Sequence, residues 1–270
     1  MNSPVSHAII LLAGTGSRLK PLTDATHKSL LKVGHQTFLE RLLRQLSQNG
    51  IQHFHLALGY RSDEVQDYVT KKLVRAYGHT PLPSVSFYEN PQFATTNNAY
   101  SLQLVLNQLA DERANTQIRP YKIESFILLD GAVMMSDELV THFMNQREKS
   151  FIVCDTRKDR LNEEAMKCIV DDKNRVVLLN KKISVVQAFG ESVGVACLQN
   201  DWCAAIKLSL AKNLKDPTKK KSWYYEDIFV DVLTTNKTLS ALQALSTKDL
   251  PWIEVDDVKD FEEAKRLFGI

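Results

Sequence analysis

A glycine turn followed by three cations is the part of this chain best suited to chemistry. The turn is Gly14-Thr15-Gly16-Ser17, and Arg18, Lys20 and Lys28 come after it. Glycine has no Cβ, so the backbone N–H groups of such a turn can approach a ligand closely. The cations add positive charge beside those N–H groups. We therefore predict that this loop binds phosphate.

A short apolar segment must hold the turn in place. Residues 8–12, AIILL, do not alternate with polar residues, which is typical of a strand covered on both faces in a parallel sheet. The functional loop should then lie at the carboxyl end of this strand. Two familiar glycine motifs do not fit, because the dinucleotide fingerprint needs a third glycine where Leu19 stands and the Walker A pattern is absent. An ordinary glycine turn on a basic surface loop is the alternative.

The same stretch resembles the signature of the nucleotidyltransferases that join a nucleoside triphosphate to a sugar phosphate or alcohol phosphate. That signature is L-A-x-G-x-G-x-R-L-x-P-L-T followed by a lysine, and the matching positions are Leu12, Ala13, Gly14, Gly16, Arg18, Leu19, Pro21, Leu22, Thr23 and Lys28. The resemblance implies nucleotide contacts for Leu12, Ala13, Gly14, Thr15, Gly16 and Ser17. It also implies that Arg18 stabilises the pyrophosphate leaving group and that Lys28 bridges to the α-phosphate.

An asparagine-rich loop follows the third predicted strand. Residues 89–102, ENPQFATTNNAYSL, are similar to the nucleotide-contacting loop of the cytidylyltransferases related to bacterial phosphocholine cytidylyltransferase. An Asn side chain offers a donor and an acceptor together, which suits the edge of a pyrimidine or the ribose hydroxyls. The resemblance implies nucleotide contacts for Asn97, Asn98 and Ser101. A helix N-cap at Asn97 is the alternative, and the two roles are compatible.

Two further segments resemble the acceptor side of this family. Residues 163–167 match its E-E-x-M-K segment and residues 190–194 match its G-E-x-x-G segment, which border the acceptor pocket. The resemblance implies that Lys167 holds the acceptor phosphate, and that Glu191 hydrogen-bonds the acceptor or orders the pocket wall. A solvated surface lysine is the alternative for Lys167.

An aromatic and acidic cluster lies further along the chain. It contains Trp223, Tyr225 and Glu226, which we assign to acceptor binding. Aromatic rings with carboxylates could cage a quaternary ammonium through cation–π attraction. Ordinary packing of a helix explains the same residues equally well.

The last motif concerns a metal ion. Residues 254–261, EVDDVKDF, resemble the family's E-I-D-x-x-x-D-[LFY] ending, in which Asp256 ligates the catalytic Mg²⁺ ion. The family also reads [DE]-[GA]-D-[VN] after the strand predicted at 126–129, whereas this chain has Asp130-Gly131-Ala132-Val133. Ala132 therefore stands where a metal-binding aspartate is expected, and it has no ligand atom.

Three interpretations of Ala132 are open. It is an engineered inactivating substitution, the mark of a naturally degenerate enzyme, or a sign that the site uses Asp130 instead. We favour the first because every other motif is intact. Asp130, which we also count among the nucleotide-binding residues, lies about 6.5 Å back along the strand and can compensate only if the turn bends. We expect this chain to bind CTP but to turn it over slowly.

Alternating strands and helices predict an α/β fold. Thr37 and Glu40 form a capping box for a helix that Gly50 ends. The predicted strands are 8–12, 53–58, 85–88, 126–129, 150–154, 167–170, 175–179 and 252–256, the predicted helices begin near 37, 62, 102, 200, 223 and 260, and a polar surface loop is expected at 111–122. The resemblance implies a Rossmann-like nucleotidyltransferase fold with a mostly parallel mixed sheet flanked by helices. We expect a single domain over 1–270 with a smaller acceptor-binding subregion at 155–222.

Composition narrows the class of partner. With 34 basic and 32 acidic residues the net charge is +2, so no broad electrostatic field favours nucleic acid or an acidic membrane. No run approaches the 18 apolar residues of a membrane span, and the start lacks a signal-peptide core, so we expect a cytoplasmic protein with four reduced thiols. A homodimer is one open possibility for the oligomeric state.

The expected reaction joins CMP from CTP to a small phosphorylated amino-alcohol, with release of pyrophosphate. Phosphocholine is the first acceptor we expect and 2-aminoethylphosphonate the second. A sugar-1-phosphate nucleotidyltransferase using UTP or dTTP is one alternative. A module that binds nucleotide without turnover is another.

Overall fold

The computed structural model describes residues 5–73, 83–111, 123–236 and 238–269. The polar loop expected at 111–122 falls, from residue 112 on, outside the described residues.

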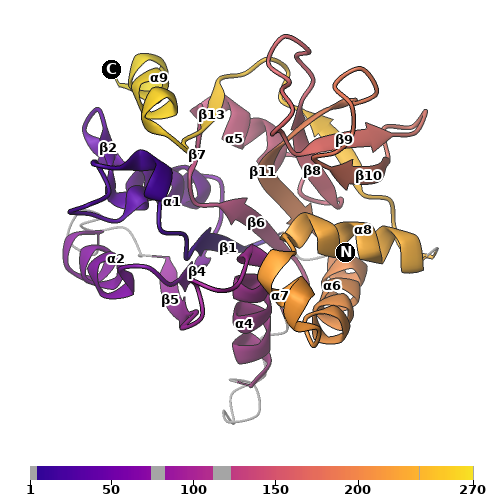
Figure 1. Cartoon of the computed structure of the whole chain (residues 1–270), viewed down its shortest axis with the longest axis horizontal. Helices are drawn as coiled ribbons and strands as arrows, with labels where there is room; N and C mark the ends of the chain where they lie inside the picture. The colour runs from indigo at the N-terminus through magenta and orange to yellow at the C-terminus, as the bar shows by residue number, and fades with distance from the viewer. Residues whose placement is uncertain (1–4, 74–82, 112–122, 237, 270) are drawn as a thin grey trace.

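A nine-stranded mixed sheet forms the centre of the described structure (Figure 1). Four parallel strands come first, in the order β5 (Ser84–Glu89), β4 (His53–Leu58), β1 (His7–Leu12) and β6 (Phe126–Asp130). The long strand β11 (Gly190–Leu198) runs antiparallel to β6, so the two neighbours of β6 are β1 and β11. The predicted fold class, a mostly parallel mixed sheet flanked by helices, is confirmed.

β11 joins this parallel part to the rest of the sheet. It also pairs with β8 (Phe151–Asp155), which in turn pairs with β12 (Gln243–Ser246). The start of β11 pairs with β9 (Lys167–Val170), and β9 forms the predicted hairpin with β10 (Val176–Asn180). β11 itself was not predicted from the sequence.

Two small antiparallel ladders stand apart from the main sheet. β13 (Trp252–Glu254) pairs with β7 (Val133–Met135), which brings the C-terminal motif beside the segment that contains Ala132. β2 (Lys32–Val33) pairs with β3 (Gln36–Thr37) just before the first helix.

Helices cover both faces of the sheet. On one side lie α1 (Phe38–Gln48), α5 (Asp137–Met144) and α2 (Ser62–Tyr68), which continues as a π-helical turn over Val69–Leu73. On the other side α4 (Asn98–Asp111), α6 (Asn200–Asn213) and α8 (Tyr225–Thr235) lie together, with the short α7 (Pro217–Ser222) before α8 (Figure 1). α9 (Val258–Phe268) packs near β2 and β13.

The alternation of side chains along β1 explains this three-layer arrangement. Ile10 and Leu12 join the core that contains the apolar faces of α1, α2 and α5, whereas Ile9 and Leu11 join the core of α4, α6 and α8. Successive residues of a strand point to opposite faces, so an uninterrupted apolar run is buried on both sides. The predicted capping box of Thr37 and Glu40 is present at the start of α1.

A stack of histidines lies at the amino ends of the parallel strands, far from the glycine turn. The rings of His7 and His53 stack at 4.5 Å, and His7 Nδ1 lies 3.0 Å from His55 Nε2. Burial, and then the nearby His53, lower the pKa of His7 to about 4, and burial with His7 lowers the pKa of His55 to about 3. Both rings are therefore neutral at physiological pH.

All four cysteines are buried free thiols, as expected for core positions. The helices in the described ranges are too short or too polar to span a bilayer.

Candidate active site

One large cavity opens at the carboxyl ends of β1 and β6. Its volume is about 1370 Å³, and α9, the 160–166 segment and the start of α8 complete its walls. Of the residues singled out in the sequence, those that line it are Ala13, Gly14, Arg18, Lys28, Asn97, Asn98, Ser101, Asp130, Glu191, Glu226 and Asp256. The structure thus brings together residues that lie up to 243 positions apart, from Ala13 to Asp256.

The glycine turn has the geometry that its sequence predicts. Gly16 adopts a left-handed conformation with φ of +63°, which L-residues with a side chain rarely adopt. A Cβ at this position would lie 3.1 Å from Lys28 Cβ and 3.2 Å from the methyl group of Thr23. Gly16 therefore permits both the turn and the close approach of Lys28. Gly14, Thr15 and Ser17 are exposed.

Helix α2 fixes the loop that carries Lys28. The carboxylate of Glu64 accepts hydrogen bonds from Thr26 Oγ1 at 2.6 Å and from the His27 backbone N–H at 3.0 Å. His27 Nε2 lies 3.0 Å from the carbonyl of Leu12, which can only accept. Burial lowers the pKa of His27 to about 4, so its ring is neutral. Sequence reasoning missed both residues. Glu64 contacts a loop distant in sequence, and His27 contacts a backbone carbonyl of β1.

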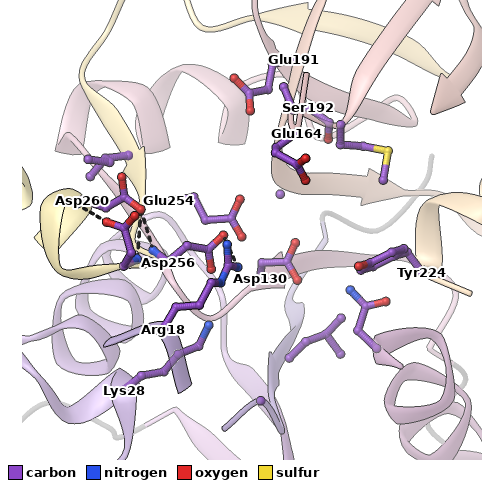
Figure 2. Close-up of a pocket in the computed structure, with 18 of the residues that line it drawn as sticks. Arg18, Lys28, Asp130, Glu164, Glu191, Ser192, Tyr224, Glu254, Asp256 and Asp260 are labelled. Atoms are coloured by element: carbon purple, nitrogen blue, oxygen red, sulfur yellow. Dashed lines mark hydrogen bonds and ion pairs between the residues drawn. The ribbon is translucent and has the colours of Figure 1, made fainter. Parts of the chain in front are cut away.

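Three carboxylates face the two cations of the loop. Figure 2 shows Arg18 and Lys28 pointing toward Asp130, Glu254 and Asp256. Arg18 forms an ion pair with Asp256 at 2.9 Å. Burial raises the pKa of Glu254 to about 8, with further contributions from Asp130 and Asp256, and Lys28 opposes that shift. Burial likewise raises the pKa of Asp130 to about 6. Because the raised pKa of Glu254 keeps its carboxyl largely neutral at pH 7, Asp130 and Asp256 are the carboxylates left to face Arg18 and Lys28, and they are the candidates to hold a bound cation.

The donor set fits a magnesium ion that takes part of its coordination from substrate. In the described ranges no three Asp, Glu, His or Cys side chains are grouped closely enough to hold a metal by themselves. Ala132 is 1% exposed and offers no side-chain oxygen, and its carbonyl accepts the Val255 N–H at 3.0 Å. Mg²⁺ is usually held by one or two carboxylates with phosphates and water. Asp256 is the candidate first carboxylate and Asp130 the candidate second.

Lys167 is used inside the protein, which corrects the expected contact with an acceptor phosphate. Its side chain is fully buried, and Nζ donates to the carbonyls of Asn162 at 3.0 Å, Glu163 at 2.8 Å and Ala165 at 3.1 Å. An ammonium group has three N–H donors, and all three have acceptors here. The surface-lysine alternative is equally wrong. Lys167 instead holds the 162–165 segment, which lines the cavity.

Glu191 stands beside Lys167 on the neighbouring strand and lines the cavity. Burial raises its pKa to about 7, Asp155 adds to the shift, and Lys167 opposes it. Figure 2 shows Glu191 with Glu164 and Ser192 across the cavity from Arg18 and Lys28.

The aromatic cluster is arranged differently from the predicted cage. The ring of Trp223 faces Lys219 Nζ at 4.4 Å, and Trp223 is not a cavity residue. Tyr225 is buried and donates its hydroxyl to Asp130 at 3.0 Å. Tyr224, which the sequence did not single out for a role, does line the cavity, and Lys181 Nζ lies 5.4 Å from its ring centroid.

Glu226, which we assigned to acceptor binding, lines the cavity, and its contact with an acceptor stays a prediction. It is 6% exposed, and its Oε2 accepts no hydrogen bond from the part of the chain that the structure describes. Burial, and then Asp130, raise its pKa well above the ordinary value.

The asparagine loop ties α4 to α7 and α8. Asn97 donates through Nδ2 to the Ser222 carbonyl at 3.1 Å, and its Oδ1 accepts the Asn98 N–H. Asn98 Oδ1 accepts the Tyr225 N–H at 2.9 Å, and Ser101 Oγ accepts from Asn90. These side chains therefore connect the elements of one cavity wall, and their contacts with a nucleotide stay a prediction.

Comparisons with known proteins identify relatives of part of this chain. The family model described as nucleotidyl transferase matches residues 7–163. A choline-phosphate cytidylyltransferase from Streptococcus pneumoniae is 36% identical over 104 residues, which are 38% of this chain and 41% of that protein. A 2-aminoethylphosphonate cytidylyltransferase from Lancefieldella rimae is 27% identical over 108 residues, 40% of each chain. This chain therefore matches about two fifths of the length of these relatives.

A solved structure extends the likeness in fold to nearly the whole chain. The CTP:phosphocholine cytidylyltransferase of Streptococcus pneumoniae superposes with a TM-score of 0.71 at 21% identity, over 97% of this chain and 99% of that one.

Proposed function

Because this chain belongs to the nucleotidyl transferase family, we propose that it transfers CMP from CTP to a small phosphorylated or phosphonate amino-alcohol, with release of pyrophosphate. The observation that carries the proposal is the single cavity in which a glycine turn with Arg18 and Lys28 faces Asp130, Glu254 and Asp256. The wall with the glycine turn, Arg18 and Lys28 suits a polyanionic substrate, and the wall with the carboxylates suits a cation.

The chemistry needs charge neutralisation rather than a general base. The acceptor oxygen is already an anion when it attacks the α-phosphorus, so the protein must offset the repulsion between two polyanions and align them. In this proposal the backbone N–H groups of the turn from Gly14 to Ser17 bind the triphosphate. Arg18 stabilises the leaving pyrophosphate, and Lys28 neutralises the α-phosphate as the new bond forms.

To stabilise the pyrophosphate, Arg18 must exchange part of its ion pair with Asp256 for a contact with the substrate. The Arg18 side chain is 69% exposed and the Asp256 side chain 32% exposed, so their ion pair is solvated and weak enough to exchange. Bound magnesium supplies positive charge to the triphosphate, and Asp256 would hold it with Asp130 as the candidate second carboxylate.

Cytosine selection and the cellular location are part of the same proposal. Asn97, Asn98 and Ser101 line the cavity and offer both donors and acceptors. The cytidylyltransferase relatives support CTP as the nucleotide. We place the reaction in the cytoplasm, where CTP is available.

A pyrophosphate-release screen tests the proposal. Four nucleoside triphosphates are each offered with phosphocholine, 2-aminoethylphosphonate, inositol phosphate and glucose 1-phosphate, using both this chain and its Ala132→Asp variant. The proposal expects release with CTP and an amino-alcohol acceptor. Preference for UTP or dTTP with the hexose phosphate would favour a sugar-1-phosphate nucleotidyltransferase instead. Tight CTP binding by calorimetry with no product from either protein would favour a non-catalytic nucleotide-binding module.

A further inference from the structure

We propose that the acceptor carries a primary ammonium group and that Glu226 selects it through a hydrogen bond to Oε2. This inference rests on the proposed function and narrows its substrate class, from any cationic amino-alcohol to one whose nitrogen is a primary ammonium group.

The proposal depends on Glu226 Oε2, a buried oxygen without a hydrogen-bond partner among the described residues. Glu226 lines the cavity at the start of α8, its side chain is almost fully buried, and Oε2 has no donor among the described residues. Buried polar atoms nearly always have a hydrogen-bond partner, because leaving one unpaired costs free energy. A donor supplied by the ligand is the simplest completion of this site.

The neighbouring charges specify the kind of donor. Glu254 and Asp130 are the carboxylates that act electrostatically on Glu226, and both line the same cavity. A neutral hydroxyl would satisfy Oε2 but would add no positive charge next to these carboxylates. An ammonium group supplies the donor and the positive charge together.

Most of the aromatic rings nearby already have partners within the protein, and Tyr224, at 37% exposed, is the most accessible of them. The face of Tyr224 already has Lys181 as its cation, and Trp223 has Lys219. Tyr225 is committed to Asp130 through its hydroxyl. Trp252, another cavity residue, is 6% exposed and donates Nε1 to Asp155 at 2.7 Å. Cation–π recognition of a quaternary ammonium needs accessible ring faces.

A quaternary ammonium would also leave Glu226 unsatisfied. Its nitrogen has no N–H, so Oε2 would stay buried without a donor after binding. Hydrogen bonds to charged groups are worth enough to change affinity by roughly ten- to a hundredfold. Sites built to hydrogen-bond a substrate group reject analogues that lack it for the same reason.

A methylation series tests this directly. Phosphoethanolamine, its N-methyl and N,N-dimethyl derivatives and phosphocholine keep one positive charge while the number of N–H donors falls from three to zero. Their affinities are measured by calorimetry on the whole chain with magnesium and α,β-methylene-CTP, and their kcat/KM values by pyrophosphate release from the Ala132→Asp variant. We expect phosphoethanolamine to exceed phosphocholine by roughly ten- to a hundredfold in both measurements.

Three variants identify the residue responsible. Glu226→Gln should remove most of the difference between phosphoethanolamine and phosphocholine, while Glu226→Asp, which keeps a carboxyl group, should retain part of it. Tyr224→Ala should leave the ratio of the two affinities unchanged. Thermal unfolding of each variant confirms that it is folded.

The possible failures are distinguishable. If phosphocholine binds as tightly as phosphoethanolamine or more tightly, or if Tyr224→Ala abolishes selectivity, the ammonium inference is wrong while the proposed function stands. If CTP binds but none of the four acceptors binds or reacts, the proposed function fails and this inference fails with it.

Discussion

At the residue scale, Lys28 is the cation whose loss should be most visible. It lines the cavity, and its Cβ packs against Gly16. Its positive charge opposes the rise in the pKa values of Asp130 and Glu254. We expect Lys28→Ala to lower kcat by roughly two to three orders of magnitude, the scale of losing one charge-stabilising donor in a transition state. Steady-state pyrophosphate release measures this.

Lys20→Ala is the matched control, since Lys20 is exposed on the same loop and paired only with Asp24 in the described structure. Near-full turnover of Lys28→Ala would remove Lys28 from the catalytic residues.

For Ala132 we predict the opposite effect, a gain of turnover on substitution. The carbonyl of Ala132 is bonded to Val255, the residue next to Asp256, so an aspartate at 132 would place a second carboxylate beside the Asp256 segment. We expect Ala132→Asp to raise magnesium-dependent turnover by orders of magnitude, because charge stabilisation by the ion is worth several kcal/mol.

Turnover of the two proteins is compared across a magnesium titration. If Ala132→Asp brings no gain while Asp130→Ala abolishes activity, the metal site uses Asp130 and our assignment of position 132 is wrong.

The sequence predicted the residues of the site better than their contacts. Arg18, Lys28, Asp130 and Asp256 were singled out from local, ordered segments and all line the cavity, while their roles stay predictions. The hydrogen bond from Tyr225 to Asp130 spans 95 residues, and no local pattern contains it. For Lys167 the residue was identified but its role was not, because its three acceptors are backbone carbonyls, which every residue carries.

At the scale of elements, the segment 162–165 depends on one buried ammonium group. Lys167→Met would leave the carbonyls of Asn162, Glu163 and Ala165 without their donor, so we expect the free energy of unfolding to fall by roughly 2–3 kcal/mol. Amide hydrogen exchange over 160–166 should accelerate, and the KM for the acceptor should rise while CTP affinity is unchanged.

Lys173→Met, in the exposed turn between β9 and β10, is the control. A large loss of turnover with unchanged hydrogen exchange would instead indicate that Lys167 contacts the acceptor.

Strand prediction succeeded where hydrophobic runs are short and bounded, as in β1, β4 and the β9–β10 hairpin. It failed for β11, whose first half is broken by Gly190 and Gly194 and whose partners β6, β8 and β9 come from three separate parts of the chain. Gly194 has φ of +75°, and a Cβ there would lie 2.9 Å from an Asp130 carboxylate oxygen. Gly194, which interrupts the strand pattern in the sequence, therefore also leaves space for the Asp130 side chain.

At the scale of the whole molecule, the histidine stack predicts a contribution to acid sensitivity. The unfolded chain protonates His7 and His55 near pH 6.5, whereas the folded protein does so only near pH 4 and 3. Between these values the unfolded state holds more protons, so this contribution to stability is present above about pH 6.5 and is lost as pH falls toward 4.

Asp130, Glu191 and Glu254 act in the opposite direction, because their pKa values are raised on folding to about 6, 7 and 8. The test therefore compares how much stability two proteins lose on acidification. Urea unfolding of the native sequence and of His7→Gln/His55→Gln is compared at pH 7.5 and pH 4.5. The native sequence should lose more stability than the variant on acidification. Equal losses would contradict a role for the stack, and His35→Gln, at an exposed position, is the control.

The position of β11 has a consequence for any attempt to divide this protein. The segment matched by the family model, 7–163, ends before β11, although β11 lies between β6 and β8 in the sheet. A polypeptide of residues 7–163 alone would expose the backbone donors and acceptors of both strands along open edges, which are templates for aggregation. We expect this fragment to associate or precipitate, as seen by size-exclusion chromatography with light scattering. A monomeric fragment with cooperative unfolding would show that the first half is an autonomous folding unit and that β11 was added to a sheet already complete.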